Sequence, residues 1–174
     1  MPSFNQVKGL AAVTVAEGKK LGEVEQLLID PDAKQVKWLL LREGRVGGTH
    51  HYVAAEAVRA IGPHAVIINS ESDVKTPAEA PEAEDLYQAK RFVVGNKLVT
   101  DKGNYVGRVS DCDFADTLKL TDIRVSTGLF AKPLFIPAEQ VMTIGKDVMI
   151  VAASAIQNPE KQEQKQEQKQ EQPG

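Results

Sequence analysis

The segment "EGKKLGEVEQLLID" at residues 17–30 recurs 85 positions later as "KGNYVGRVSDCDFA" at residues 102–115. Glycines align with glycines in the two segments, and apolar residues align with apolar residues. Further along, at an offset of 83, "YVAAEAVRAIG" at residues 52–62 matches "FIPAEQVMTIG" at residues 135–145. Self-similarity of this kind indicates that the chain carries two copies of one structural unit.

Each copy has the pattern of β structure. Short apolar runs are separated by Gly, Pro, Asp or Asn, and no stretch has a long 3.6-residue period. The sequence "PAEQV" at residues 137–141 predicts a single helical turn, because proline is accepted at the first helical position. In the first copy we expect strands near residues 12–15, 22–29, 35–41, 51–53 and 65–68.

Both copies break the alternation of apolar and polar residues at the same place. The spacing between apolar residues is three rather than two from Val24 to Leu27, and again from Val109 to Cys112. An extra residue at this point predicts a β-bulge, which bends a strand as the closure of a small barrel requires.

Two segments have a different composition. Residues 71–87 are rich in Ala and Pro, and their first part, residues 71–85, carries six acids against one lysine, which favours a linker. We therefore assign the two copies to residues 1–70 and 88–157. Residues 158–174 repeat "KQEQ" without a large apolar residue, which predicts a disordered tail.

The stretch "DCDFAD" at residues 111–116 places three aspartates beside the single cysteine. An EF-hand loop needs a central glycine and a distal glutamate, and neither is present. The repeat aligns Cys112 with Leu27, so we expect a buried strand cysteine, with Asp111 and Asp113 pointing to the other face. The pattern is explained without a metal ion.

The histidines also give no catalytic or metal site. His50, His51 and His64 all lie in the first copy, and we expect them to be solvated loop residues. A Ser-His-Asp or Cys-His set cannot be assembled, because Cys112 belongs to the copy without histidine. We therefore expect a protein that is not an enzyme and that has no catalytic residue, no metal ligand and no cofactor.

Composition narrows the class of protein further. The formal net charge is −3, and the two copies are nearly neutral, without the basic stripe that phosphate binding requires. A single cysteine cannot form an internal disulfide, and the first residues do not have the pattern of a secretion signal. No apolar run is long enough to span a membrane. These features predict a cytoplasmic protein.

The order of the motifs resembles the PRC-barrel family. The motifs are "EGKKLGEV", "LLID", "VAAEAV" and "AVII" in the first copy, and "KGNYVGRV", "DCDFAD", "IPAEQV" and "DVMIV" in the second. The first copy has Ala54 where the family pattern has proline. The resemblance implies an all-β fold of two tandem small barrels of about six strands each, with one short helical turn per barrel.

The resemblance also implies a function. Members of the family include the cytoplasmic part of the photosynthetic reaction-centre H subunit and the C-terminal domain of the ribosome-maturation factor RimM, and both act through contact and assembly. We expect a non-catalytic module that docks onto a protein or a large complex. The alternative is an RNA-linked role in ribosome maturation or RNA processing. That role needs a basic face, and only Lys19-Lys20 and Lys90-Arg91 hint at one.

The candidate partner-binding residues are Leu129, Phe130, Lys132 and Leu39. The first three lie in "STGLFAKPL" at residues 126–134, a loop bounded by glycine and proline. Apolar anchors at a loop tip suit the pocket of a partner. Leu129 and Phe130 equally suit a plug that folds back into the barrel.

Leu39 belongs to the continuous apolar run at residues 38–41, in which the offset aligns Trp38 with Ile123. A strand with apolar residues on both faces is buried on both faces. We therefore expect the outer face of this strand to be covered, either by the second barrel or by a second chain in a homodimer.

Overall fold

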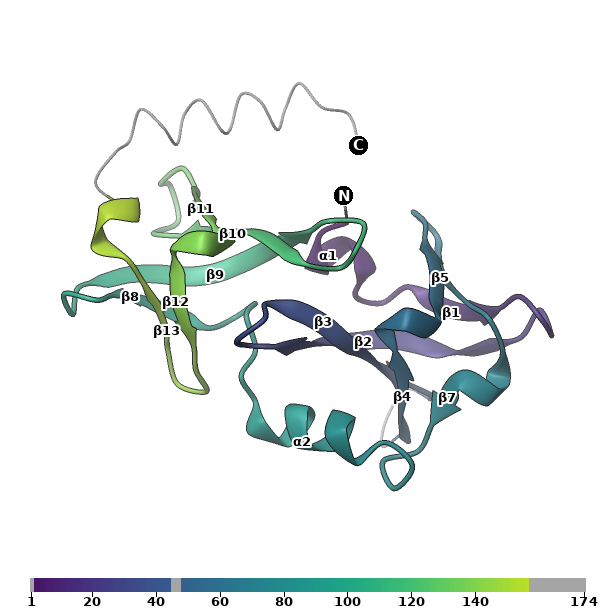
Figure 1. The fold of residues 1–174 in the computed structure, drawn as a ribbon. Helices are drawn as coiled ribbons and strands as arrows, with labels where there is room; N and C mark the ends of the chain where they lie inside the picture. The colour runs from purple at the N-terminus through teal and green to yellow at the C-terminus, as the bar shows by residue number, and fades with distance from the viewer. Residues whose placement is uncertain (1, 45–47, 157–174) are drawn as a thin grey trace. The chain divides into compact units, whose positions relative to one another are not determined.

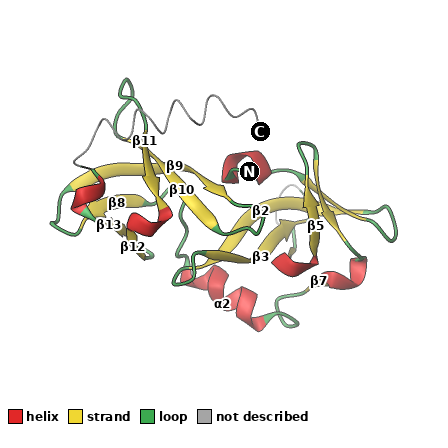
Figure 2. Cartoon of the chain, turned by 45° about the horizontal axis from the view of Figure 1, so that its top comes forward, coloured by secondary structure: helices red, strands yellow, loops and turns green. Residues whose placement is uncertain are grey.

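The computed structural model describes residues 2–44 and 48–156. The chain divides into two units, and the second begins at Arg91. Each unit is built around one antiparallel-rich sheet, with seven strands in the first and six in the second (Figure 1). Strands dominate both units, and the helical segments are short (Figure 2). The predicted all-β class and the tandem arrangement are confirmed.

The first unit contains seven strands in the order β5-β6-β1-β2-β3-β4-β7. Five of them were predicted, while β5 and β7 were missed. The strands are β1 (Ala11–Thr14), β2 (Lys20–Asp30), β3 (Gln35–Arg42), β4 (His50–Ala54), β5 (Val58–Ile61), β6 (Ala65–Ile68) and β7 (Val74–Lys75). The helical segments are α1 (Phe4–Val7), η1 (Ala55–Ala57), η2 (Glu71–Asp73) and α2 (Pro81–Ala89).

The second unit repeats this topology. Its order is β11-β10-β9-β8-β13-β12, which is the order of the first six strands of the first unit. In both units the first strand pairs in parallel with the last strand of the repeat, β1 with β6 and β8 with β13. The elements are β8 (Lys97–Thr100), β9 (Tyr105–Phe114), β10 (Leu120–Ser126), β11 (Leu134–Pro137), η3 (Ala138–Gln140), β12 (Val141–Ile144), β13 (Met149–Val151) and η4 (Ala153–Ala155).

The predicted helical turn is present in both copies, as a 3-10 turn. It is η3 in the second unit and η1 in the first, and in each the residue before the turn has an extended backbone. Pro137 holds this position in the second unit and Ala54 holds it in the first. The missing proline in the first copy therefore does not change the local structure.

The predicted bulges are also confirmed. The register of β2 against β3 slips between Val24 and Gln26, and the register of β9 against β10 slips between Val109 and Asp111. These positions are 85 residues apart, as the repeat requires. One residue in each slip, Glu25 or Ser110, is left out of the Cα register with the neighbouring strand. An extra residue of this kind bends the strand and increases its twist.

A glycine stands before the bulge in each copy because a neighbouring strand passes close to it. A Cβ added at Gly22 would lie 2.7 Å from the carbonyl oxygen of Arg42, and one added at Gly107 would lie 2.2 Å from that of Ser126. A real Cβ atom cannot approach a backbone oxygen so closely without a shift of the strand. The shared glycine is thus a requirement of the bent sheet.

The segment at residues 71–87, predicted to be a linker, is instead folded as part of the first unit. The segment contains η2, the strand β7, which pairs with β4, and most of the helix α2, and all of it belongs to the first unit. The composition gave no helical signal, because the residues buried here are the N-cap Ala80 and, within α2, Ala83, and two alanines do not form an apolar stripe. The unit boundary falls between Lys90 and Arg91. The predicted tail at residues 158–174 lies outside the described residues.

The alignment of Trp38 with Ile123 is also wrong, by one residue. Leu39 pairs with Leu27, and Ile123 pairs with Cys112, the counterpart of Leu27. Ile123 is therefore the counterpart of Leu39, and both are fully buried. Leu39 is a core residue and cannot contact a partner.

The expectation that β3 is buried on both faces is confirmed, and within the first unit helix α2 lies on the face opposite Leu39. Leu40, on the face opposite Leu39, is fully buried and pairs with Tyr52 of β4. The Tyr52 hydroxyl donates a hydrogen bond to Glu84 of α2, and α2 packs on β2. The helix that composition assigned to a linker covers this face.

Candidate functional site at the β10–β11 loop

Residues 127–133 connect β10 to β11, and two large apolar side chains stand at the tip of this loop. Leu129 is 97% exposed and Phe130 is 101% exposed. The exposed fractions of the other large apolar residues that project into solvent are lower, from 50% to 65%. A plug inside the barrel would be buried, so that alternative for Leu129 and Phe130 is wrong.

The base of the loop is fixed by the sheet. Val125 pairs with Leu134 across the hairpin, and Ser126 pairs with Arg108 of β9. The Arg108 guanidinium donates a hydrogen bond to the carbonyl oxygen of Gly95, at 2.7 Å from Nη1. The apolar tip therefore projects from an ordered base rather than from a long irregular segment.

The charge around the tip has one sign. Lys132 is exposed on the loop and Arg108 is exposed beside its base, while residues 126–133 contain no acidic side chain. The loop thus offers two apolar side chains with positive charges at their flank. The corresponding hairpin of the first copy reads "EGRVGGT" at residues 43–49 and has no adjacent pair of large apolar residues. By sequence, the adjacent pair of large apolar residues is a feature of the second copy and not of the first.

Cys112 is buried, as predicted, with 1% of its surface exposed. Asp111 lies on the opposite face of β9, as predicted, but it is 5% exposed rather than solvated. Its Oδ1 accepts a hydrogen bond from the Cys112 backbone N–H at 2.8 Å. In the first copy, Gln26 Oε1 accepts the same bond from Leu27 N–H at 3.1 Å. The aspartate therefore supports the bulge.

Asp111 also takes part in a group with two neighbours. Its Oδ2 lies 4.0 Å from Nη1 of Arg124, and the Arg124 guanidinium lies 5.1 Å from the centre of the Phe135 ring, within reach of a cation–π interaction. Throughout residues 2–44 and 48–156, no group of three or more His, Cys, Asp and Glu side chains is placed to hold a metal ion.

The histidines are not loop residues, contrary to the prediction, except His64. His50 and His51 lie on β4 and are half-buried. His50 Nε2 lies 3.4 Å from Glu25 Oε2 and 3.4 Å from Arg42 Nη2, and Arg42 Nε donates to the same Glu25 oxygen at 3.0 Å. The sequence did not show this cluster, because it depends on the bulge residue Glu25 facing the end of β3.

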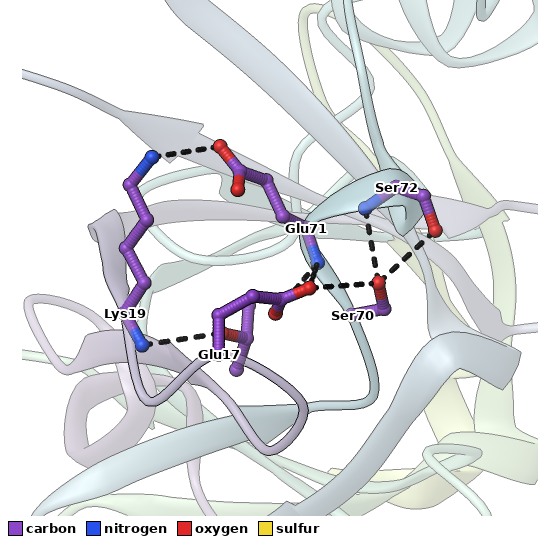
Figure 3. A network of polar contacts seen from close by, with 6 residues as sticks. Glu17, Lys19, Ser70, Glu71 and Ser72 are labelled. Atoms are coloured by element: carbon purple, nitrogen blue, oxygen red, sulfur yellow. Dashed lines mark hydrogen bonds and ion pairs between the residues drawn. The ribbon is translucent and has the colours of Figure 1, made fainter.

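A second polar network joins the β1–β2 turn to η2 (Figure 3). Glu17 accepts hydrogen bonds from the Ser70 hydroxyl at 3.1 Å and from the Glu71 N–H at 3.3 Å. Lys19 Nζ lies 2.7 Å from the Glu71 carboxylate. A hydrogen bond from Thr14 is the main cause that lowers the pKa of Glu17, and the bond to Glu71 raises the pKa of Lys19.

The second copy contains a reduced form of this network. Asp101 Oδ1 accepts from the Ala153 N–H at the start of η4, at 3.0 Å. The buried Thr100 hydroxyl accepts from Asn104 N–H at 3.2 Å, as the Thr14 hydroxyl accepts from Lys19 N–H at 3.2 Å. Because both copies use it to close the same turn, this network is part of the scaffold.

Most of the basic residues that hinted at an RNA-binding face have partners within the protein. Lys19 is ion-paired with Glu71, and Lys20 Nζ lies 3.3 Å from Glu23. Arg91 Nε donates to the carbonyl oxygen of Ile144 at 2.7 Å. Three of the four basic residues named for that face therefore contact an acceptor within their own unit.

Comparison with known proteins agrees with the fold. The model of the PRC-barrel domain matches the chain twice, at residues 2–75 and 91–157. A search of curated proteins finds no match. Over the described part of the chain, no helix has the length and apolar character needed to cross a membrane. Because the two matches span most of the sequence and coincide with the two sheets, the chain belongs to the PRC-barrel family and contains two PRC-barrel domains in tandem.

Proposed function

We propose that this protein is a non-catalytic module that docks onto a protein or a large protein complex through the loop at residues 127–133. PRC-barrel domains are often interaction or assembly modules, which supports the general class. The observation that carries the proposal is the full exposure of Leu129 and Phe130 at an ordered hairpin tip.

Burial of the two apolar side chains at the loop tip would contribute favourably to the free energy of binding a partner. One exposed apolar side chain is common on protein surfaces. Two adjacent ones at a protruding tip are a concentrated source of binding energy, since burial of each stabilises a complex by roughly 1.5–3 kcal/mol. Anchors of this kind fill a pocket of the partner and dominate the affinity. Lys132 and Arg108 would then steer a partner whose pocket has an acidic rim.

The absence of catalysis is supported by what the reactive side chains do. Cys112 is buried in the core, and Asp111 supports the β9 bulge. His50 is held between Glu25, Arg42 and the ring of Tyr87. Each of these groups has a structural role that accounts for its position.

An RNA-linked role has less support. It needs several Lys and Arg side chains that are free to neutralise phosphates. Lys19, Lys20 and Arg91 instead contact acceptors within the first or second unit. The fully exposed side chains at the tip of the β10–β11 loop, Leu129 and Phe130, are apolar, and this favours a protein partner.

The test compares two variants of the full chain as baits in the cells that make it. Leu129→Ser with Phe130→Ser removes the anchors, and Met142→Ser, which changes a 60% exposed residue of β12, is the matched control. We expect the copurified protein to be lost with the first bait and retained with the second. Purified partner should then bind the first variant at least about tenfold more weakly than wild type.

Both variants should retain the unfolding midpoint of wild type, because substitutions of exposed side chains usually change stability by less than about 0.5 kcal/mol. A loss of binding in the Leu129→Ser, Phe130→Ser variant is then caused by the loss of the two apolar contacts and not by unfolding. The proposal is contradicted if the same partner binds the Leu129→Ser, Phe130→Ser variant with unchanged affinity.

A further inference from the structure

Helix α2 packs on β2 and accepts a hydrogen bond from Tyr52 of β4. Figure 1 shows it beside these strands. Leu40 of β3 and Tyr52 of β4 are paired on the face of the sheet that α2 contacts, and neither has any exposed surface. Glu84 of α2 accepts the Tyr52 hydrogen bond, and the ring of Tyr87 meets His50 edge-on with 5.5 Å between ring centres. The face therefore already binds a helix, one that comes from the same chain.

The helix is an addition to the repeated fold. The family matches cover residues 2–75 and 91–157, so α2, at Pro81–Ala89, lies outside both. The second unit builds the same six-strand order without a counterpart of α2 in its described residues, 91–156. The part of the chain that matches the family fold therefore does not include this helix.

Helix α2 is also expected to have little helical stability without its contacts to the sheet. It has nine residues, and its N-cap, Ala80, makes no side-chain hydrogen bond. Isolated helices shorter than about 12–15 residues are marginal in water. Within α2, whose residues are all described, Ala83 alone is buried. The sheet supplies most of the apolar groups, and the alanines allow the helix to approach it.

The remaining contacts are polar and lie at the rim of the face. Glu84 accepts from Tyr52 and, within the helix, from Gln88 Nε2 at 2.9 Å. Water can replace these hydrogen bonds when the helix leaves, because Glu84 and Tyr87 are only half-buried. Detachment would expose Leu40 and Tyr52 and would restore the conformational freedom of the helix.

We propose that this face is a helix-docking site, that α2 is its intramolecular ligand, and that its external ligand is a partner helix of the same chemistry. Such a helix presents small residues to the sheet, a glutamate to the Tyr52 hydroxyl, and an aromatic ring three residues later to His50. The site is closed while α2 is docked and opens when α2 is displaced. This site is independent of the loop at residues 127–133.

A tethered ligand competes strongly with a free one. A short linker holds α2 at an effective concentration on the order of millimolar. An external helix therefore binds the wild-type chain with an affinity reduced by the fraction of molecules in which α2 is detached. Weakening of α2 docking in the protein should strengthen the binding of an external helix.

The first measurement follows amide hydrogen exchange in the wild-type chain. We expect the amides of residues 84–89 to exchange by local opening, far faster than the central amides of β3, because α2 detaches without unfolding of the sheet. Exchange of α2 and β3 amides at one common rate would overturn the proposal, since the helix would then be an inseparable part of the core.

The second measurement uses a labelled peptide with the sequence of residues 74–90 and the full chain carrying Ala83→Arg. Arginine at this buried position should expel α2 and leave the strands in place. We expect the peptide to bind this variant at least about tenfold more tightly than wild type. A peptide with alanine at both Glu84 and Tyr87 is the control and should bind at least about fivefold more weakly than the unmodified peptide.

Three results would overturn the proposal in this second measurement. They are unfolding of the first sheet by Ala83→Arg, equal binding of the peptide to both proteins, and equal binding of the two peptides to the variant. The first would show that α2 is required by the fold, and the other two that the face does not recognise a helix of this chemistry. None of these results affects the proposal for the β10–β11 loop.

Discussion

Single residues that the two copies share account for the bend of each sheet. Gly22 and Gly107 allow the neighbouring strand to pass, and Gln26 and Asp111 accept a hydrogen bond from the next N–H at the bulge. The sequence predicted the bulge, because an extra residue interrupts the alternation. It did not predict the role of Asp111, because that role depends on which atoms the bulge brings together.

Replacement of Gly107 by alanine should destabilise the second unit. The added Cβ would lie 2.2 Å from the Ser126 carbonyl oxygen, so β10 must shift, at a cost of about 1–3 kcal/mol. Gly128→Ala is the matched control, because its Cβ meets no atom within 4 Å. Urea unfolding should give a lower midpoint for Gly107→Ala and an unchanged one for Gly128→Ala. Equal midpoints would refute the close approach of the strands.

At the scale of elements, the strands were predictable and the helix was not. A strand such as β1 has a burial pattern that alternates along its own sequence. Helix α2 has little pattern of its own, because its one buried residue is Ala83 and its other contacts are supplied by Tyr52 and His50 of β4. The one-residue error at Leu39 has a similar origin, since the offset changes within the strands and only the pairing of Leu27 with Leu39 fixes it.

Acidification should loosen α2. The hydrogen bond from Tyr52, and then that from Gln88, lowers the pKa of Glu84 from its ordinary value of 4.5. The carboxylate therefore stabilises the docked helix above pH 4.5, and this contribution is lost as the pH falls through the lowered pKa. Amide protection in α2, relative to that in β3, should decrease over this range.

The Glu84→Gln variant provides the control for this titration. Glutamine retains an oxygen that can accept the Tyr52 hydrogen bond, but it has no proton to gain in this pH range. Its relative protection in α2 should not change with pH. An acid response of the same size in Glu84→Gln would show that another group is responsible.

At the scale of the whole molecule, the repeat predicted two domains of one fold, and the family matches agree with it. The boundary was misplaced, because an acidic Ala/Pro-rich composition is typical of linkers even where tertiary contacts order the chain. The candidate site was predicted in part. Leu129 and Phe130 are exposed because the hairpin tip offers nothing to bury them, whereas Leu39 is a core residue.

Each unit should fold without the other. The two sheets share no strand, and each unit carries its own buried core. Fragments 1–90 and 91–174, produced separately, should each give a cooperative unfolding transition and the amide protection of the corresponding unit in the full chain. A fragment that remains unfolded alone would show that its core needs the other unit.

The central claim is that the β10–β11 loop contacts a protein partner, and site-specific photo-crosslinking tests it most directly. A photoreactive phenylalanine analogue is placed at Phe130 in the full chain, and at Met142 as the control, in the cells that make the protein. The account predicts a discrete crosslinked protein from position 130 that is absent from position 142. No crosslink from position 130, or the same products from both positions, would contradict it.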